Sequence, residues 1–162
     1  MKFTLVAGML ASVLGSTAAF AQAPSVPDKD FVMKGSVGNT FEIEESKLAL
    51  QHATDARLKR YAEKMISDHQ DAEKKLQTAG GKAGDKTEMM LDTPHQAMLD
   101  NLKTFTGTDF DKIYIADQVA SHDETVNLLS DYRQNGDNKS LKGWAEKTLP
   151  IVKEHREMID AM

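Results

Sequence analysis

The sequence predicts an all-α fold, namely a ferritin-like four-helix bundle with a short extra helix in the long crossover between its two hairpins. Three long stretches repeat apolar residues at intervals of three and four, which is the spacing of helices that bury one face. Another long stretch, at the start of the domain, is also predicted to be helical, with Phe31, Phe41 and Leu48 on its inner side. A lengthy connection with a short helical stretch of its own separates the second long stretch from the third. Simple up-and-down bundles use a shorter middle link, so this connectivity favours the ferritin-like arrangement.

The first 21 residues are predicted to be a cleaved secretory signal. A positive start at Lys2 precedes an apolar run over 3–14, and small residues around Ala21 mark the expected cleavage point. Residues 22–27 are predicted to be a flexible leader, and 28–162 the bundle domain. No later stretch approaches the roughly 20 apolar residues of a transmembrane helix. We therefore expect a periplasmic or otherwise exported protein with no transmembrane segment in the mature chain.

The composition excludes several classes of protein. The chain has no cysteine, which excludes disulfides, cysteinyl zinc or iron–sulfur sites and c-type haem attachment. Its net charge of −5 comes from acidic and basic residues that are interspersed along the chain, whereas binding to nucleic acid needs a basic face. We therefore expect no nucleic-acid partner, and the sequence points to no particular partner protein or oligomeric state.

Capping residues set the bounds of the first two long helices. Asp28 is the predicted N-cap of a helix over about 29–53. Thr54-Asp55 interrupts the pattern and can cap a second helix over about 56–79. The pair Gly80-Gly81 ends that helix.

The second half of the chain repeats this logic. Thr93-Pro94 predicts the start of a short helix over about 94–105, because proline is favoured in the first helical turn. The third long helix is expected over about 108–134 and the fourth from about 139 to the end. Pro150 lies inside the fourth helix and predicts a kink near its midpoint. No convincing strand pattern is present.

Three of the long helices each place one histidine in the middle of an apolar stripe. Counted from the hairpin turns at 1.5 Å per residue, His69, His122, His155 and Glu42 of the first helix all lie roughly 18–24 Å from their turns. We therefore expect these four side chains in one central layer of the bundle, whichever way the hairpins pack. The stripes are Leu58, Ala62, Met65, His69, Ala72 and Leu76; Ile115, Val119, His122, Val126 and Leu129; and Leu141, Ala145, Thr148, Val152, His155, Ile159 and Met162.

These residues suggest a transition-metal site. Imidazole suits zinc, copper, iron and nickel, whereas calcium and magnesium prefer oxygen ligands. Three imidazoles and one carboxylate can hold such an ion directly, with Glu42 as the first candidate acid and Glu45 and Asp68 as weaker candidates. The candidate metal ligands are therefore Glu42, His69, His122 and His155.

Two other interpretations stay open. Di-iron bundles carry Glu-x-x-His on two helices, but here the residues three before the histidines are Ile66, Val119 and Val152. An oxidase or peroxide-consuming enzyme is thus disfavoured, as is non-covalent haem, for which the layer would have to open. The main alternative is a metal-free structural or interaction protein of the cell envelope, in which the histidines and Glu42 form a buried hydrogen-bonded network.

Several short segments of the chain, taken in their order and spacing, match the pattern of a known family. They are Phe41-Glu42-Ile43-Glu44 with Lys47-Leu48-Ala49, Tyr61-Ala62, Met65-Ile66-Ser67-Asp68-His69, Phe110-Asp111-Lys112-Ile113-Tyr114, Gln118-Val119-Ala120-Ser121-His122, and Leu149-Pro150 with His155. Over about residues 28–160 they resemble the exported bacterial family known as domain of unknown function 4142, a ferritin-like group. The resemblance implies the fold and an envelope location. Its motif positions include Asp68 and all four residues of the predicted layer, which favours a functional layer for metal handling or stress protection.

Overall fold

The computed structural model describes residues 26–83 and 90–162, and every regular element in these ranges is helical. The predicted signal peptide, 1–21, and most of the predicted leader, 22–27, lie outside the described residues. The all-α class and the short helix in the crossover are confirmed. The elements are α1 (Asp28–His52), α2 (Ala56–Gly80), a 3₁₀ turn η1 (Gly81–Ala83), α3 (Thr93–Leu102), α4 (Gly107–Asn135) and α5 (Lys139–Asp160).

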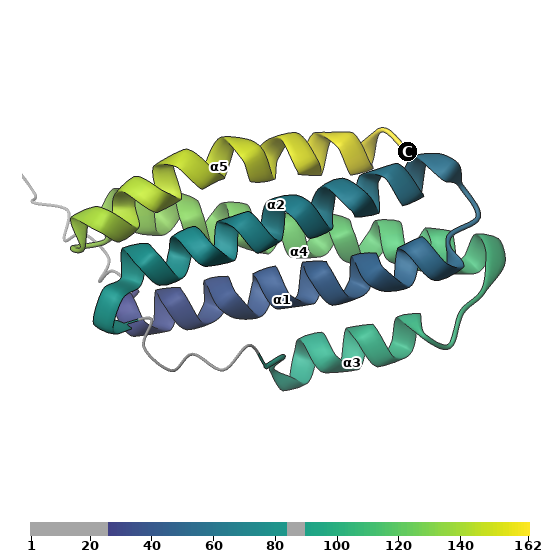
Figure 1. Ribbon diagram of the computed structural model, residues 1–162, viewed down its shortest axis with the longest axis horizontal. Helices are drawn as coiled ribbons and strands as arrows, with labels where there is room; N and C mark the ends of the chain where they lie inside the picture. The colour runs from purple at the N-terminus through teal and green to yellow at the C-terminus, as the bar shows by residue number, and fades with distance from the viewer. Residues whose placement is uncertain (1–25, 84–89) are drawn as a thin grey trace, which may run out of the picture.

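The four long helices form two antiparallel hairpins that pack side by side (Figure 1). The first hairpin is α1 with α2 and the second is α4 with α5; across the pair, α1 contacts α4 and α2 contacts α5. The two hairpin turns lie at opposite ends of the bundle, and α3 lies along α1 on the way back between those ends (Figure 1). This long crossover gives the ferritin-like arrangement that the sequence predicts.

Capping at the start of the first hairpin differs in one place from the prediction. Asp55 caps α2 as expected, because its carboxylate accepts from the Arg57 backbone N–H at 2.7 Å. Asp28 is not the cap of α1, since Pro27 holds that position. The Asp28 carboxylate instead accepts from the Tyr132 hydroxyl and from Asn138 Nδ2 at 3.2 Å. It therefore ties the start of α1 to the α4–α5 turn, a tertiary role that local sequence cannot show.

The later helix bounds differ from the predicted ones by a few residues at most. Asp92, and not Thr93, caps α3 by accepting from the His95 backbone N–H at 3.1 Å. The short helix ends at Leu102, before the predicted 105. The last helix continues across Pro150 as a single element. Among the described residues, none of the helices is long and apolar enough to cross a membrane.

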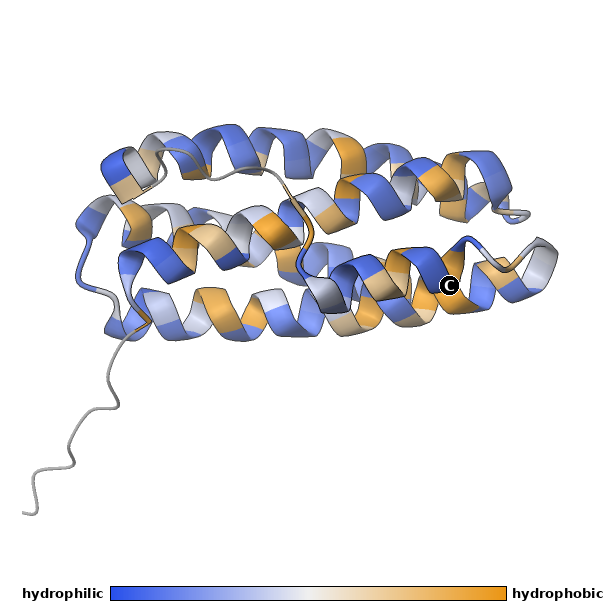
Figure 2. Cartoon of the chain, turned by 90° about the horizontal axis from the view of Figure 1, so that it is seen from below, coloured by the Kyte–Doolittle hydropathy of each residue, from blue (hydrophilic) through white to orange (hydrophobic). Residues whose placement is uncertain are grey.

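The apolar core is divided into two clusters, one toward each end of the bundle. The first cluster includes Phe31, Leu129 and Trp144, and the second includes Met65, Phe110 and Ile159. Orange and blue segments alternate along the helices in Figure 2, as expected of helices that bury one stripe. Between the two clusters most of the buried side chains are polar, and they include all three histidines of the predicted stripes.

The buried face of α4 is more polar than predicted. Ile115, Val119 and Val126 of the predicted stripe are only partly buried. The buried positions in this stretch are instead Tyr114, Gln118, Ser121 and His122, followed by Leu129. The stripe rotates because the polar side chains of α4 turn inward to bind acids on α1. Hydropathy alone assigns such residues to the surface, so the prediction identified His122 and Leu129 but not the polar part of the buried face. The three partly buried residues still pack against the apolar clusters.

One carboxylate fastens the first hairpin turn to the second hairpin. Asp111 accepts from the Thr54 backbone N–H at 2.9 Å, from the Thr54 hydroxyl, and from the Asp55 backbone N–H at 3.2 Å. We expect Asp111→Ala to lower the free energy of unfolding by about 2–3 kcal/mol, because it leaves these partly buried donors without an acceptor. Urea denaturation measures the effect. Asp109→Ala, two residues away and paired with Lys112 at the surface, should change the value by less than about 0.5 kcal/mol.

Candidate metal centre

The three predicted histidines meet in the middle of the bundle. His69 comes from α2, His122 from α4 and His155 from α5, and their side chains are 4%, 1% and 1% exposed. The ring centroids lie 5.6–5.8 Å apart. One nitrogen from each ring lies within 4.8 Å of the other two. We call these three residues the histidine triad; it joins both hairpins, since α2 belongs to one and α4 and α5 to the other.

The ring of His69 is held by a chain of hydrogen bonds that ends on a buried acid. Its Nδ1 lies 3.0 Å from Oδ1 of Asn39, and Asn39 Nδ2 donates to Glu73 at 2.9 Å. Glu73 also accepts from Ser36 Oγ at 2.8 Å and from Gln77 Nε2 at 2.6 Å. Because the Asn39 amide is fixed by Glu73, its oxygen faces the imidazole. Nδ1 of His69 must therefore carry the proton that it donates.

The other two rings are held in the same way. Nδ1 of His122 donates to the backbone carbonyl of Gln118 at 2.8 Å. Nε2 of His155 donates to the carboxylate of Asp68 at 2.8 Å, and Asp68 also accepts from Lys64 at 3.0 Å. Each histidine thus uses one nitrogen as a donor to an oxygen. In a neutral ring, the second nitrogen then keeps a free lone pair.

The second nitrogens face one another. Nε2 of His69, Nε2 of His122 and Nδ1 of His155 are buried and have no hydrogen-bond partner among the described residues. A buried polar atom without a partner costs about 1–3 kcal/mol, so three of them in one place need an explanation. Inward-facing lone pairs on rings oriented by outer hydrogen bonds are typical of histidine ligands to a metal ion.

Burial keeps His69 and His155 in the form that a metal requires. It lowers the pKa of His69 well below its ordinary value, and the charges of His122 and His155 act in the same direction. Burial also lowers the pKa of His155 to about 4, although the hydrogen bond to Asp68 opposes this shift. Both rings are therefore neutral at pH 7. A metal can bind their lone pairs without first displacing a proton.

Glu42, the first candidate acid, lies behind His122. Its Oε1 accepts from Ser121 Oγ at 2.5 Å and lies 3.3 Å from Nδ1 of His122, and its Oε2 accepts from Gln118 Nε2 at 2.5 Å. Glu42 does not belong to the three-residue cluster that could hold an ion. The structure therefore places Glu42 outside the set of three converging nitrogens, where it can orient His122.

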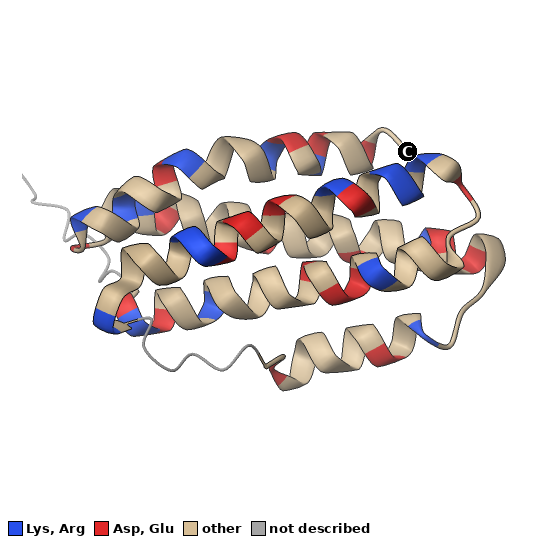
Figure 3. Ribbon diagram, in the orientation of Figure 1, with Lys and Arg blue, Asp and Glu red and all other residues tan. Residues whose placement is uncertain are grey.

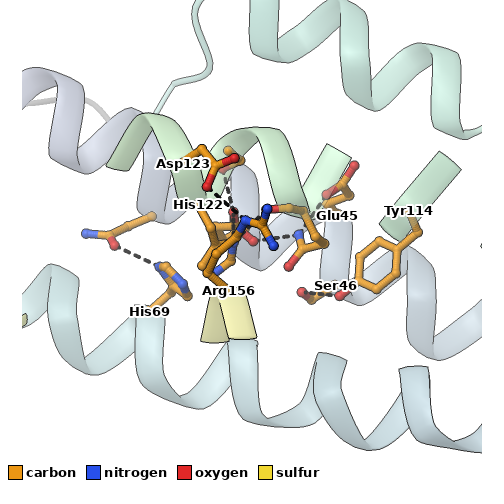
Figure 4. A network of polar contacts seen from close by, with 11 residues as sticks. Glu45, Ser46, His69, Tyr114, His122, Asp123 and Arg156 are labelled. Carbon is orange, nitrogen blue, oxygen red and sulfur yellow. Dashed lines mark hydrogen bonds and ion pairs between the residues drawn. The ribbon is translucent and has the colours of Figure 1, made fainter. Parts of the chain in front are cut away.

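The two weaker candidate acids lie at different depths. Glu45 is fully buried and accepts from Gln118 Nε2 at 2.8 Å. Burial raises the pKa of Glu45 well above its ordinary value, and the neighbouring charge of Glu42 raises it further. Figure 4 shows Glu45 away from His69 and His122, toward Tyr114. Asp68 is 31% exposed and binds the outer nitrogen of His155. Neither acid belongs to the three-residue cluster that could hold an ion.

Sequence reasoning missed most of the residues that support the triad. Asn39, Glu73, Gln118 and Ser121 are buried polar side chains that the apolar stripes did not include. A signal was present in their spacing. Asn39 stands three residues before Glu42, Glu73 four after His69, and Gln118 four before His122. Residues three or four apart share one face of a helix, so polar residues at these intervals from the predicted layer can be expected inside it.

The arrangement can hold one metal ion. Three nitrogens bound to one tetrahedral ion at about 2.0–2.1 Å lie about 3.3 Å from one another, so the rings would need to move inward by roughly 1 Å. Such a movement requires small rotations of side chains that already face one another. The donor set consists of neutral imidazoles alone, which suits zinc, copper, iron or nickel better than calcium or magnesium.

The fold and the buried triad define a ferritin-like helical bundle with a histidine-rich interior. The chain belongs to the family described as domain of unknown function 4142, which matches residues 14–162 and confirms the resemblance found in the sequence. No curated protein matches the chain.

Three solved structures of the protein CopM are similar to this chain. The Cu(II)-bound form has 20% sequence identity and a TM-score of 0.69, and the match covers 85% of this chain and 95% of that one. The form soaked with Ag has 19% identity and a TM-score of 0.68, with coverages of 85% and 94%. The Cu(I)-bound form has 18% identity and a TM-score of 0.70, with coverages of 85% and 95%. At this level of identity the likeness shows a common fold.

Proposed function

We propose that this protein binds one transition-metal ion through His69, His122 and His155, and serves metal handling or stress protection in the cell envelope. The observation that carries this proposal is the set of three buried, unpartnered nitrogens that face one another. A purely structural core has no use for three unpaired lone pairs at one point, since each of them lowers stability. A metal ion would satisfy all three together.

The surrounding acids support the same proposal. Behind each imidazole stands one carboxylate: Glu73 acts through Asn39 on His69, Glu42 lies beside His122, and Asp68 binds His155. Outer carboxylates of this kind fix the ring orientation and make the ligand more basic. They would also offset the charge of a cation held by three neutral rings, which is costly to bury uncompensated.

Copper is the metal that we favour. Among divalent first-row ions, copper binds nitrogen donors most tightly, and imidazole is a common copper ligand. CopM, which shares the fold, binds copper in two of the similar structures. Zinc, iron and nickel are the competitors that the donor set also suits. We propose binding and handling of the ion, without turnover of a substrate, in the periplasm after removal of the signal peptide.

Metal analysis of protein purified without a histidine tag tests the proposal. We expect close to one equivalent of metal per chain after dialysis against copper, and a titration end point at one equivalent. Elemental analysis by mass spectrometry gives the first value, and competition with a chromophoric chelator gives the second. A protein that retains none of the four metals would contradict the proposal.

The alternative function is a metal-free structural or interaction protein of the envelope. The hydrogen bonds that link α1 with α2 and α4 through Glu73 and Glu42 favour it, because such a network fixes how the helices align. It predicts that no metal binds and that the triad serves packing alone. The metal analysis therefore separates the two functions directly.

A further inference from the structure

A groove runs between α2 and α5 and reaches two members of the triad. Its volume is about 940 Å³, and His69 and His155 line it together with residues of both helices. The groove is open because small residues face one another across it, including Ala72, Ala79 and Gly143. A Cβ atom added at Gly143 would meet no heavy atom within 4 Å. This space is large enough for a hydrated ion, since one water occupies about 30 Å³ in the liquid.

The opposite side of the bundle is covered. There, α3 packs on α1 and α4, so the seam between the hairpins lies beneath another helix on that side. A second, smaller hollow at the end of the bundle is lined by Tyr61 and Met158 among others, and by none of the three histidines. Of these two hollows, the α2–α5 groove is the one that reaches the triad.

The ring of His155 lines the groove and also belongs to the triad. Its Nε2 binds Asp68, which is partly exposed at the groove, and its Nδ1 is the unpartnered nitrogen that faces the other histidines. An ion that enters the groove from solvent would reach the Asp68 carboxylate before it reaches the unpartnered nitrogen of His155. If the Asp68 bond breaks, the imidazole can turn about its Cβ–Cγ bond and move with the ion toward the interior.

The place beside Asp68 already holds a cation from the chain itself. The ammonium of Lys64 lies 3.0 Å from Oδ2 of Asp68 and 3.7 Å from Oε1 of Glu154. Both acidic and basic residues lie along α2 in Figure 3. The Lys64 ammonium thus occupies a position between two carboxylates next to a metal-binding ring, where an incoming metal ion would be stabilised.

From this geometry we propose that metal ions exchange with the triad through the α2–α5 groove, received by Asp68 and Glu154 in place of the Lys64 ammonium. The proposal rests on the proposed function, because it describes how the same site is filled. It concerns rates: residues along the route change how fast an ion enters and leaves. The affinity is set by the triad and the acids behind it.

Stopped-flow mixing of the metal-free protein with Cu(II) tests the route. The single tryptophan, Trp144, lines the groove, and its quenching by Cu(II) reports arrival of the ion. We expect Lys64→Met to speed uptake by about two- to fivefold, because one positive charge and one competitor are removed from the entrance. Glu154→Gln should slow uptake by a similar factor. Release into excess chelator should change by the same factor as uptake, so that the dissociation constant stays within about twofold.

A matched ion pair on the same helix supplies the control. Lys75 binds Asp71 at 2.5 Å with the same spacing of four residues, also at the groove. It lies 11 residues from Lys64, or about 16 Å along the helix, which is beyond the screening length of about 8 Å at physiological salt. Lys75→Met should therefore leave both rates unchanged.

The outcomes separate the route from the function. If the wild-type protein binds copper but Lys64→Met and Glu154→Gln take it up at the wild-type rate, the route is wrong and the function stands. Equal effects from the Lys64 and Lys75 variants would also overturn the route, since they would indicate general charge attraction. If the wild-type protein binds no metal, the proposed function fails and the route fails with it.

Discussion

Copper added to the metal-free protein is expected to raise its melting temperature by about 8–16 °C when the free ion reaches 1,000 times its dissociation constant. Binding to the native state alone stabilises it by about 4 kcal/mol at that ratio. For a chain of this size, each kcal/mol moves the midpoint by about 2–4 °C. The combined variant His69→Leu, His122→Leu and His155→Leu should show no shift. Calorimetry or circular dichroism at a series of copper concentrations gives the result.

The same variant has a second expected effect without metal. Leucine fills the space of each imidazole and removes the three unpartnered nitrogens, so the metal-free variant should be more stable than the wild-type protein by about 2 kcal/mol or more. A variant at the exposed His52, His52→Leu, should retain the full copper shift. A wild-type protein that gains no stability from copper, zinc, iron or nickel would contradict metal binding, and a more stable variant would then support the structural alternative.

Acidification should destabilise the metal-free protein below pH 6.5. The pKa of His155 falls from about 6.5 in the unfolded chain to about 4 in the native state. The contribution of neutral His155 to the free energy of unfolding is fully present above pH 6.5. It is lost as the pH falls toward 4, because the unfolded chain then binds a proton that the native state does not bind. The loss amounts to about 3 kcal/mol by pH 4. His69, whose pKa is also lowered, adds to it.

Glu45 acts in the opposite direction. The pKa of Glu45 is raised in the native state. Its contribution to the free energy of unfolding is therefore fully present below about pH 4.5 and is lost as the pH rises through the native pKa. Urea denaturation between pH 4 and 8 measures both effects. His155→Leu should reduce the acid loss, Glu45→Gln should reduce the loss at higher pH, and His52→Gln should leave the profile unchanged. A wild-type acid profile in His155→Leu would rule out this origin of the pH dependence.

The sequence was sufficient for the parts of the fold that local signals determine. Asp55 and Gly81 set the ends of α2, because capping and left-handed turns depend on a few neighbouring residues. The central position of the triad followed from helical rise alone, because each histidine stands a similar number of residues from its turn. The sequence left open whether the hairpin turns lie together or apart, and the structure places them at opposite ends.

The residues that the sequence did not predict are those whose role depends on another helix. Gln118 and Ser121 are polar, and nothing near them in α4 indicates that they bind Glu42 on α1. Asp28 stands where an N-cap is expected, but its partner Tyr132 is 104 residues away. Buried polar side chains contradict the apolar pattern from which the core was predicted, and their partners are visible only once the helices are packed.

The division of the core has a consequence for how the protein holds together. Each apolar cluster stabilises its own end, and the hairpins meet at the middle through polar side chains. An ion held by His69 on one hairpin and by His122 and His155 on the other would act as a cross-link at the waist of the molecule. Both apolar clusters contain residues of both hairpins, so the ends stay joined whether or not metal is bound. Metal binding would therefore tighten the polar middle layer in particular, and backbone amides there would exchange with deuterium more slowly when the site is filled.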